Sequence, residues 1–287
     1  MEKSNDRSGS SVSEGGVGPV LTDAEFELFR KLIYDAAGIS MAPSKKALIS
    51  GRLSKRLREL GYATFRDYFN WIDKARNDPA AKRERQNAID HLTTNETYFF
   101  REEKHFDFIR DRLIPQWAGR SVKLWSAASS SGEEAYTLAM VMEQYHRGSW
   151  EIIGTDISTR VVASATRGQY PLLRAKNIAR DYLKKYCLKG VGENEGTFRI
   201  DAKLRRKVSF RTANLQEDLS SVGTFDLIML RNVLIYFNVE IKKRVVANVL
   251  RQLKPGGCLM VGHSESLHGV TAAVKAVTPA TYIKEGG

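Results

Sequence analysis

The hydrophobic positions of residues 21–94 follow the period of helices rather than that of strands. Apolar residues there recur three and four places apart, which puts them on one face of a helix. Thr22 followed by Glu25 forms a capping box, which predicts that the first helix begins there, and Gly38 predicts its end. We therefore expect a separate, small all-helical domain. Its helices are expected over about residues 22–38, 45–60, 64–75 and 79–92.

From residue 121 the pattern changes to short apolar runs that alternate with amphipathic helices. This alternation predicts a doubly wound α/β domain with a mostly parallel sheet, here over residues 121–287, and leaves residues 95–120 as a linker. Strands are expected over about residues 122–126, 150–157, 207–211, 226–230, 258–262 and 281–283, and helices over 133–145, 161–167 and 239–253.

Residues 172–206 interrupt this alternation and are long for a simple connection. Gly190, Gly192 and Gly196 lie close together just before a short apolar run at 197–200. Such a turn feeding a strand predicts that the segment is an inserted subdomain with a small antiparallel sheet.

One apolar run ends in polar residues that a buried strand would not carry. Residues 226–230 predict a strand, and Arg231, Asn232 and Tyr236 follow it. Burying such groups without partners costs roughly 2–7 kcal/mol each. Because ligands of α/β sheets bind at the carboxyl ends of the strands, we predict a ligand site at this edge.

Other residues expected at the same edge favour an adenosine ligand. The turn at 127–132 consists of small residues, which let a ligand approach the backbone. Asp156 ends the second strand, where an acid can bind ribose hydroxyls, and Asn214 and Leu215 follow a later strand, where they could touch an adenine. An aspartate that ends a strand is also a common loop residue, so Asp156 alone decides nothing.

The turn at 127–132 also disfavours two kinds of nucleotide site. It lacks G-x-G-x-x-G, which disfavours a nicotinamide dinucleotide, and it lacks G-K-[ST], which disfavours a phosphate-binding loop. Glu133 at the start of the next helix would repel a pyrophosphate. It suits a ligand with a positive end, such as the amino group or sulfonium of S-adenosylmethionine.

The formal net charge of +12 implies an acidic partner, which could be nucleic acid, an anionic membrane surface or an acidic protein. No apolar run approaches the roughly 18 residues of a transmembrane helix, so we expect no membrane insertion. Residues 1–20 are rich in Ser and Gly without an apolar core, which predicts a disordered tail and no signal peptide.

The cysteines and histidines favour a cytoplasmic protein without a metal. Cys187 and Cys258 are two lone thiols far apart, which suggests a reducing compartment and no disulfide framework. The five histidines show no H-x₃-H or H-E-x-x-H spacing, so we expect no metal site.

Four motifs occur in order along the chain. They are residues 93–102 (TTNETYFFRE), 125–134 (WSAASSSGEE), 231–237 (RNVLIYF) and 262–265 (GHSE). Together they resemble the CheR family of chemotaxis receptor methyltransferases, over about residues 22–285. The resemblance implies a Rossmann-like S-adenosylmethionine-dependent methyltransferase domain, with the all-helical N-terminal domain before it and an antiparallel β-subdomain inserted in it.

The activity that this resemblance implies is O-methylation of protein glutamates. The methyl group would pass from S-adenosylmethionine to specific glutamates in the cytoplasmic domain of a chemoreceptor (a methyl-accepting chemotaxis protein), giving methyl esters and S-adenosylhomocysteine. A glutamate with a pKa near 4.3 is already ionised at neutral pH, so it needs no general base. The absence of a Ser-His-Asp or Cys-His arrangement is therefore expected.

The resemblance also implies roles for individual residues. Arg101 and Tyr236 would lie near the transferred methyl group and be catalytic. From the residues alone, a salt bridge from Arg101 to Glu102 or Glu103 is an equal alternative. Residues 95–120 would contribute cofactor contacts as well as link the domains. The implied cofactor-binding residues are Asn95, Thr97, Arg101, Glu133, Asp156, Asn214, Leu215, Arg231 and Asn232.

Some members of this family grip a short peptide at the C-terminus of the receptor, and the glycine spacing of residues 189–196 resembles theirs. The peptide would add a strand to the edge of the small sheet. The alternative is a surface loop with no ligand. The residues implied for this peptide site are Lys189, Gly190, Gly192 and Gly196.

The helix expected over residues 45–60 carries many basic side chains, of which Arg52, Lys55 and Arg56 are candidates for docking the acidic helices of a receptor. The alternative is an ordinary solvated face.

Two rival functions stay open on the sequence. An RNA or DNA methyltransferase would use the same cofactor fold with a basic surface, although the chain has no N-P-P-Y motif, and we expect no nucleic acid among its partners. A binding module could keep S-adenosylmethionine as a structural ligand or a signal.

Overall fold

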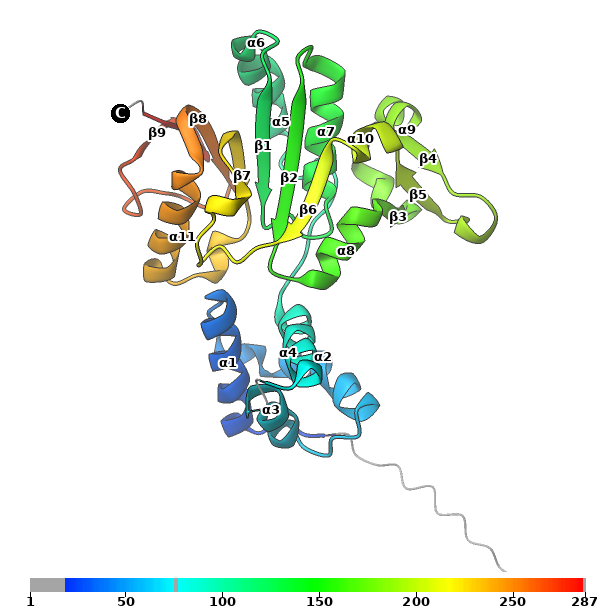
Figure 1. Cartoon of the computed structure of the whole chain (residues 1–287), viewed down its shortest axis with the longest axis vertical. Helices are drawn as coiled ribbons and strands as arrows, with labels where there is room; N and C mark the ends of the chain where they lie inside the picture. The colour runs from blue at the N-terminus through cyan, green and yellow to red at the C-terminus, as the bar shows by residue number, and fades with distance from the viewer. Residues whose placement is uncertain (1–18, 75–76, 286–287) are drawn as a thin grey trace, which may run out of the picture.

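The computed structural model describes residues 19–74 and 77–285, which form a helical domain and a larger α/β domain (Figure 1). Of the tail predicted over residues 1–20, only the last two residues are described, so that prediction lies almost entirely outside the described residues. None of the described helices is both long and apolar enough to span a bilayer.

The helical domain has the helices that its periodicity predicts. At the first of them, Thr22 N donates to Glu25 Oε2 at 2.9 Å and Glu25 N donates to Thr22 Oγ1 at 3.3 Å, which confirms the capping box. Gly38 ends the helix with a left-handed φ of 71°. The aromatic rings of Phe29 and Phe65 are fully buried at the centre of the domain. Its helices are α1 (Asp23–Ala37), α2 (Lys46–Glu59), α3 (Phe65–Lys74) and α4 (Pro79–Leu92), with a 3₁₀ turn η1 (Pro43–Lys45).

The large sheet of the α/β domain has the strand order β6-β2-β1-β7-β8-β10-β9. From β6 to β8 the neighbouring strands pair in parallel, and β10 is antiparallel to both of its neighbours. The prediction of a mostly parallel sheet is therefore confirmed. The strands are β1 (Val122–Ala127), β2 (Trp150–Asp156), β6 (Val208–Thr212), β7 (Phe225–Leu230), β8 (Leu253–Val261), β9 (Val274–Thr278) and β10 (Thr281–Lys284).

Two features of this sheet differ from the expectation. Strand β8 begins at Leu253, because Leu253 already pairs with Phe225 of β7, and the strand then continues through an irregularity in register at which Gly256 has a positive φ of 72°. Strand β9, which was not predicted, closes the edge of the sheet beside β10. Its residues are mostly exposed, so no buried face marks it in the sequence.

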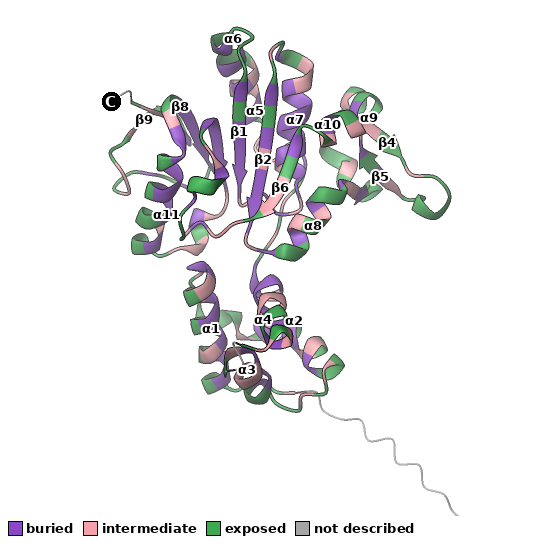
Figure 2. Cartoon of the chain, viewed as in Figure 1, coloured by how far each residue is buried: buried purple, intermediate pink, exposed green. Residues whose placement is uncertain are grey.

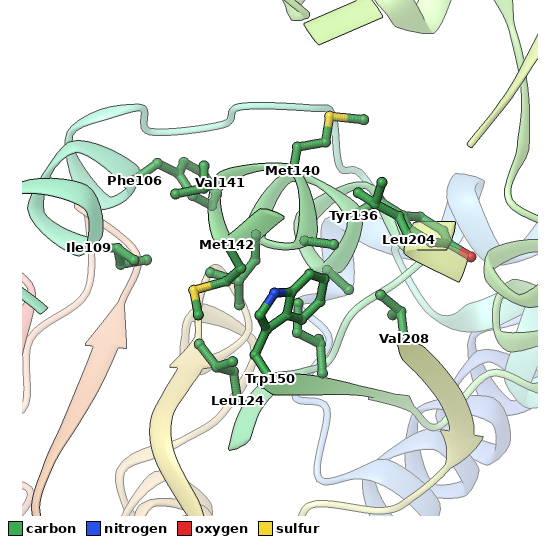
Figure 3. Close-up of a cluster of buried hydrophobic side chains, with 14 of the residues drawn as sticks. Phe106, Ile109, Leu124, Tyr136, Met140, Val141, Met142, Trp150, Leu204 and Val208 are labelled. Carbon is green, nitrogen blue, oxygen red and sulfur yellow. The ribbon is translucent and has the colours of Figure 1, made fainter. Parts of the chain in front are cut away.

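Helices cover both faces of the sheet and bury its central strands (Figure 2). On one face, Tyr136 and Met140 of α7 pack in a cluster that includes Leu124 of β1 and Trp150 of β2 (Figure 3). On the other face, α11 packs through residues such as Val245. The remaining elements of this domain are α5 (Lys104–Phe108), the π-helical turn η2 (Ile109–Leu113), α6 (Ile114–Trp117), α7 (Glu133–Tyr145), α8 (Thr159–Arg167), η5 (Ser220–Val222), η6 (Leu234–Tyr236) and α11 (Val239–Arg251).

The predicted insertion forms its own antiparallel sheet, with the order β3-β5-β4. Its first strand begins at Gln169, slightly before the expected segment at 172–206, because the chain turns at Gly168 directly into a strand that pairs with β5. The insertion consists of β3 (Gln169–Pro171), η3 (Leu172–Asn177), α9 (Arg180–Tyr186), β4 (Cys187–Lys189), η4 (Gly192–Asn194), β5 (Thr197–Ile200) and α10 (Ala202–Arg205).

Among the contacts between the helical domain and the α/β domain, one carboxylate makes several hydrogen bonds. Asp90 of α4 accepts hydrogen bonds from the backbone N–H groups of Thr159 and Arg160, both at 3.1 Å, and from Thr159 Oγ1 at 2.7 Å. These are first-turn groups of α8, whose free N–H groups and positive dipole end favour an acid. Asp90 therefore holds α4 against the carboxyl edge of the sheet.

Candidate active site

A cavity of about 440 Å³, the main cavity, lies where the helical domain meets the carboxyl edge of the large sheet. Residues from both domains line it, and the two domains also pair directly beside it, where Ile39 and Phe237 form an isolated antiparallel bridge. The fold brings together here nine of the residues that the sequence singled out. They are Asn95, Thr97, Arg101, Asp156, Asn214, Leu215, Arg231, Asn232 and Tyr236.

Arg231 is the most deeply held of these residues, with 1% of its side chain exposed. It donates to Glu134 Oε2 and to Glu102 Oε2, both at 2.9 Å, and its guanidinium lies 5.7 Å from the centre of the Phe106 ring. Burial alone favours a higher pKa for Glu102, but hydrogen bonds from Asn232 and Arg231 outweigh it and lower the pKa. The two carboxylates therefore fix the orientation of Arg231, and this part of the lining is the inner wall of the main cavity.

The loop that carries Asn232 is held by one carboxylate from another loop. Asn232 has a left-handed φ of 56°, which is uncommon for a residue with a side chain. Glu265 accepts from the backbone N–H groups of Asn232 at 2.8 Å, Gly262 at 2.6 Å and Ile235 at 3.2 Å. The loops after β7 and β8 are thus joined through Glu265, and the Asn232 side chain is free to donate to Glu102 Oε1 at 3.0 Å.

Asp156 lies at the end of β2 and is 6% exposed. Its two carboxylate oxygens each accept a backbone N–H at 2.9 Å, from Ser130 and from Ser158. Burial raises the pKa of Asp156, and these two hydrogen bonds counter the rise in part. Since a carboxylate accepts about four hydrogen bonds, capacity is left for hydroxyl groups of a ligand.

Asn214 and Leu215 line the same cavity from the segment after β6. The Asn214 amide donates to the carbonyl oxygen of Ala36 at 2.9 Å and to Glu217 Oε1 at 3.0 Å, and its own oxygen accepts from Gln216 N. Asn214 therefore also anchors the helical domain. Leu215, buried to 8% exposure, offers an apolar surface beside it.

Arg101 and Tyr236 lie at the rim of the cavity and keep their polar ends largely free. Arg101 donates to the carbonyl oxygen of Glu96 at 2.9 Å, and its guanidinium lies 5.6 Å from the centre of the Tyr98 ring. The alternative of a salt bridge from Arg101 to Glu102 or Glu103 does not form within the described residues, where Glu102 pairs with Arg231 instead. The Tyr236 hydroxyl has no hydrogen bond within the described residues, and burial raises its pKa.

Glu133 differs from the other predicted cofactor residues, because it lines a neighbouring cavity and not the main one. It is 1% exposed, and its carboxylate accepts from Ser131 Oγ at 2.6 Å and from Arg174 at 3.2 Å. The next residue, Glu134, faces the main cavity. Burial raises the pKa of both carboxyl groups. A cofactor role for Glu133 stays a prediction.

Three acidic residues that shape the wall were missed on the sequence. Glu102, Glu134 and Glu265 each hold Arg231 or Asn232 in place. Each lies inside one of the motifs noted above, so the motifs contain the signal. Arg231 and Asn232 are at least 33 positions away from them along the chain, and no local spacing reveals such a pairing.

The lining suits S-adenosylmethionine. A volume of about 440 Å³ lies within the roughly 300–1,000 Å³ of small-molecule sites. Ser129 Oγ and Arg231 Nε are buried at this wall without a hydrogen-bond partner, and buried polar atoms nearly always have one. The carboxylate and hydroxyl groups of the cofactor could provide these partners, and Asp156 could accept from the ribose.

His105 lies behind Glu102 and is 2% exposed. Burial, followed by the charge of Arg231, lowers its pKa to about 3, so the ring is neutral. Within residues 19–74 and 77–285, His105, Glu102 and His263 are the one group whose possible metal-ligand atoms lie within 4.8 Å of one another. The Glu102 oxygens already accept from Arg231, Asn232 and the His263 backbone N–H. We therefore do not interpret this group as a metal site.

The basic residues predicted for docking on α2 differ in how free they are. Arg52 points inward and donates to the carbonyl oxygens of His91, Leu92 and Thr93 at 3.0–3.3 Å, at the end of α4. Arg56 forms a two-pronged pair with the buried Glu84 at 2.6 and 2.7 Å. Lys55 is 80% exposed and lies 3.8 Å from Glu59. A docking role for the three stays a prediction.

The residues predicted for peptide binding lie along one outer edge of the insertion. Strand β4, which ends at Lys189, is an edge strand of the small sheet. A side chain at Gly190 would meet the carbonyl oxygen of Asn194 at 2.0 Å, whereas Gly192 and Gly196 have open space around them and positive φ angles of 58° and 79°. These glycines shape the turn between β4 and β5.

Comparison with known proteins agrees with this architecture. The all-alpha domain of CheR methyltransferases matches residues 24–93, and the SAM-binding domain of CheR methyltransferases matches residues 95–283. The boundary between the two matches falls at the domain junction described above.

Three curated relatives cover most of their own length and of this chain. Chemotaxis protein methyltransferase 2 of Pseudomonas aeruginosa is 37% identical over 267 residues, covering 91% of this chain and 93% of the relative. Chemotaxis protein methyltransferase of Borreliella burgdorferi is 34% identical (92% and 95% covered), and that of Escherichia coli is 36% identical (86% and 85% covered). The chain belongs to the CheR methyltransferase family, whose S-adenosylmethionine-binding domain forms its α/β part.

Proposed function

We propose that this protein transfers the methyl group of S-adenosylmethionine to the side-chain carboxylate of glutamates in the cytoplasmic domain of a chemoreceptor. The products are glutamate methyl esters and S-adenosylhomocysteine, and the role is sensory adaptation in the cytoplasm. One observation carries the proposal: Arg101 and Tyr236, with nearly uncommitted polar groups, lie at the rim of a cavity whose inner wall suits the cofactor.

The chemistry asks little of the protein beyond position and exclusion of water. Bound S-adenosylmethionine supplies an electrophilic methyl group. A glutamate with an ordinary pKa near 4.3 arrives as a carboxylate and can attack without a base. Because the opposite charges of the reactants cancel in the reaction, a site with little water favours it, provided that the groups are aligned.

Arg101 can align the incoming carboxylate with a charge-assisted hydrogen bond. Its contacts with Glu96 and the Tyr98 ring hold it at the rim without neutralising its charge. The ring of Tyr236 lines the path beside it. We assign Arg101 to positioning the substrate rather than to clamping it, because a tight ion pair would weaken the nucleophile.

The insertion supports a tether to the C-terminal peptide of the receptor. Strand β4 is an edge strand that a peptide can extend. Leu188 within this strand is 55% exposed and Val191 just after it is 77% exposed, which offers apolar contacts. Titration of the protein with such a peptide should give weaker binding for Gly190→Val than for wild type. Equal affinity would contradict a tether at this edge.

The methyl transfer itself is tested with purified protein, S-adenosylmethionine labelled in its methyl group, a chemoreceptor cytoplasmic domain and, as control substrate, RNA. We expect label on the receptor that alkali releases as methanol, as for a carboxyl methyl ester. Label on RNA alone would favour the nucleic-acid methyltransferase. Bound cofactor without any transfer would favour a sensor.

A further inference from the structure

A second cavity of about 540 Å³, the arginine cavity, gathers positive side chains from three parts of the chain. Arg52 comes from α2, Arg160 and Arg167 from α8, and Arg174 from η3 of the insertion. Figure 1 shows α8 between the helical domain and the small sheet. Among the lining residues that the structure describes, Glu133 is the one carboxylate, so four guanidinium groups face one acid.

The two arginines of α8 have little to bind within the protein. Arg160 and Arg167 are seven positions apart, so they share one face of the helix, with Ser164 between them. Both arginines are exposed. The Arg160 guanidinium donates one long hydrogen bond, 3.4 Å to the carbonyl oxygen of Asp90. The Arg167 side chain has no hydrogen bond or ion pair in the part of the chain that the structure describes.

The other two arginines are committed to the fold. Arg174 donates to the carbonyl oxygen of Thr97 at 2.6 Å and to Glu133 at 3.2 Å. Arg52 holds the end of α4 through three carbonyl oxygens. In each of them Nη1 makes these hydrogen bonds, so the fold fixes the position of the guanidinium while its charge still faces the cavity. The guanidinium groups of the α8 pair make only one long hydrogen bond between them within the described residues, so they are the ones most free to turn toward an anion.

The positive charges are close enough to disturb one another. Burial, followed by the charge of Arg160, lowers the pKa of both Arg52 and His91. Like charges gathered in a concave site repel each other and focus the electrostatic potential. An anion placed among them removes this repulsion.

The arginine cavity adjoins the main cavity, since Thr93 and Asn95 line both. A polypeptide that places one carboxylate in the main cavity can therefore reach the arginine cavity with its neighbouring side chains. A free mononucleotide or a phosphate ion has no such reason to lie beside the methyl-transfer site.

We propose that the arginine cavity binds acidic side chains that flank the glutamate to be methylated, through Arg160 and Arg167. This inference rests on the proposed function and names a carboxylate-rich polypeptide as the partner of α8. It places the direct contacts on α8 rather than on α2, because Arg52 is held in place through its Nη1, Arg56 is paired with Glu84, and Lys55 does not line the arginine cavity.

The test compares wild type with the double variant Arg160→Ala, Arg167→Ala. The matched control is Arg112→Ala, Arg147→Ala, which removes the same charge from exposed positions outside both cavities. We expect the α8 variant to lose about tenfold in kcat/KM for the receptor domain at low salt, with the gap narrowing at high salt, while its affinity for S-adenosylhomocysteine stays that of wild type. Equal kcat/KM in the two double variants would overturn the proposal.

A binding measurement keeps this test separate from the methylation itself. Fluorescently labelled poly-L-glutamate is titrated with the same three proteins, and a labelled RNA of equal charge competes. We expect binding that the α8 variant loses and the control keeps, whether or not any receptor is methylated. Unchanged poly-L-glutamate binding in the α8 variant, or a clear preference for RNA that depends on Arg160 and Arg167, would contradict the proposal. Failure of methylation alone would count against the proposed function.

Discussion

The inner wall and the rim of the main cavity hold their arginines in opposite ways. Arg231 in the wall is buried between two carboxylates and has only its Nε without a partner. Arg101 at the rim has one carbonyl partner and an aromatic neighbour. A buried charge must be paired to be tolerated, whereas a rim charge can stay available. The wall is therefore held in one shape, and the charge at the rim stays available for the substrate-positioning role proposed for Arg101.

Breaking the wall should have the largest effect. Arg231→Ala leaves Glu102 and Glu134 facing each other without a counter-charge, which should cost about 3–5 kcal/mol of folding free energy. Urea unfolding measures this, and the matched change at the rim, Arg101→Ala, should cost less than about 1 kcal/mol. Similar losses for the two variants would erase the distinction between wall and rim.

The same rim variant should act on turnover instead. Without Arg101 the carboxylate of the substrate is poorly aligned, and we expect kcat to fall about 100-fold. Affinity for S-adenosylhomocysteine, measured by calorimetry, should change little, because the wall is intact. An unaltered kcat would remove Arg101 from the reaction.

The pH dependence of stability tests the buried His105, which lies behind Glu102 of the wall. The pKa of His105 is about 3 in the folded protein and near 6.5 in the unfolded chain. The unfolded state therefore binds the proton first as pH falls below 6.5, and stability is lost. From pH 7 to pH 5 this group alone should remove about 2 kcal/mol.

The control for this measurement is His105→Leu, which replaces the imidazole at the buried position with an apolar side chain of similar size that does not titrate. Urea unfolding of the variant should show a pH dependence smaller by that amount over the same interval. If wild type and variant lose stability in parallel, His105 is not the titrating group.

The smallest of these effects is expected for Glu265, the carboxylate that joins the loops after β7 and β8. Glu265→Gln keeps the size of the side chain but leaves one oxygen for the three N–H groups that Glu265 holds. We expect a loss of about 1–2 kcal/mol in stability and weaker cofactor binding, with kcat at saturating cofactor nearly unchanged. A fall in kcat without a change in affinity would place Glu265 in the reaction rather than in the wall.

Locally encoded features were predictable from the sequence. The start of α1 is encoded within a few positions by the capping box of Thr22 and Glu25. The end of β7 is encoded in the same way by the polar residues that follow it. Strand β9 and the early start of β8 were missed, because exposure in one and Pro255-Gly256 in the other hide the usual pattern.

Long-range pairings were out of reach for a similar reason. The sequence predicted that the basic side chains of α2 lie on a helix. It did not predict the direction in which Arg52 points, because the partners of Arg52 lie at the end of α4. The same holds for Glu102 and Arg231, which are 129 positions apart along the chain and meet only in the folded protein. Sequence motifs singled out residues that line the main cavity, and the tertiary contacts determine which of them are held in its wall.

The contact of Asp90 with the first turn of α8 has a consequence for movement. The helix that carries Arg160 and Arg167 is also the one to which the helical domain is fastened. A tilt of that domain would loosen this fastening and separate Arg52 from the α8 pair in one motion. A substrate that contacts both Arg52 and the α8 pair would bind best when the domain is not tilted. Its binding would therefore shift the population toward the closed arrangement around the methyl donor.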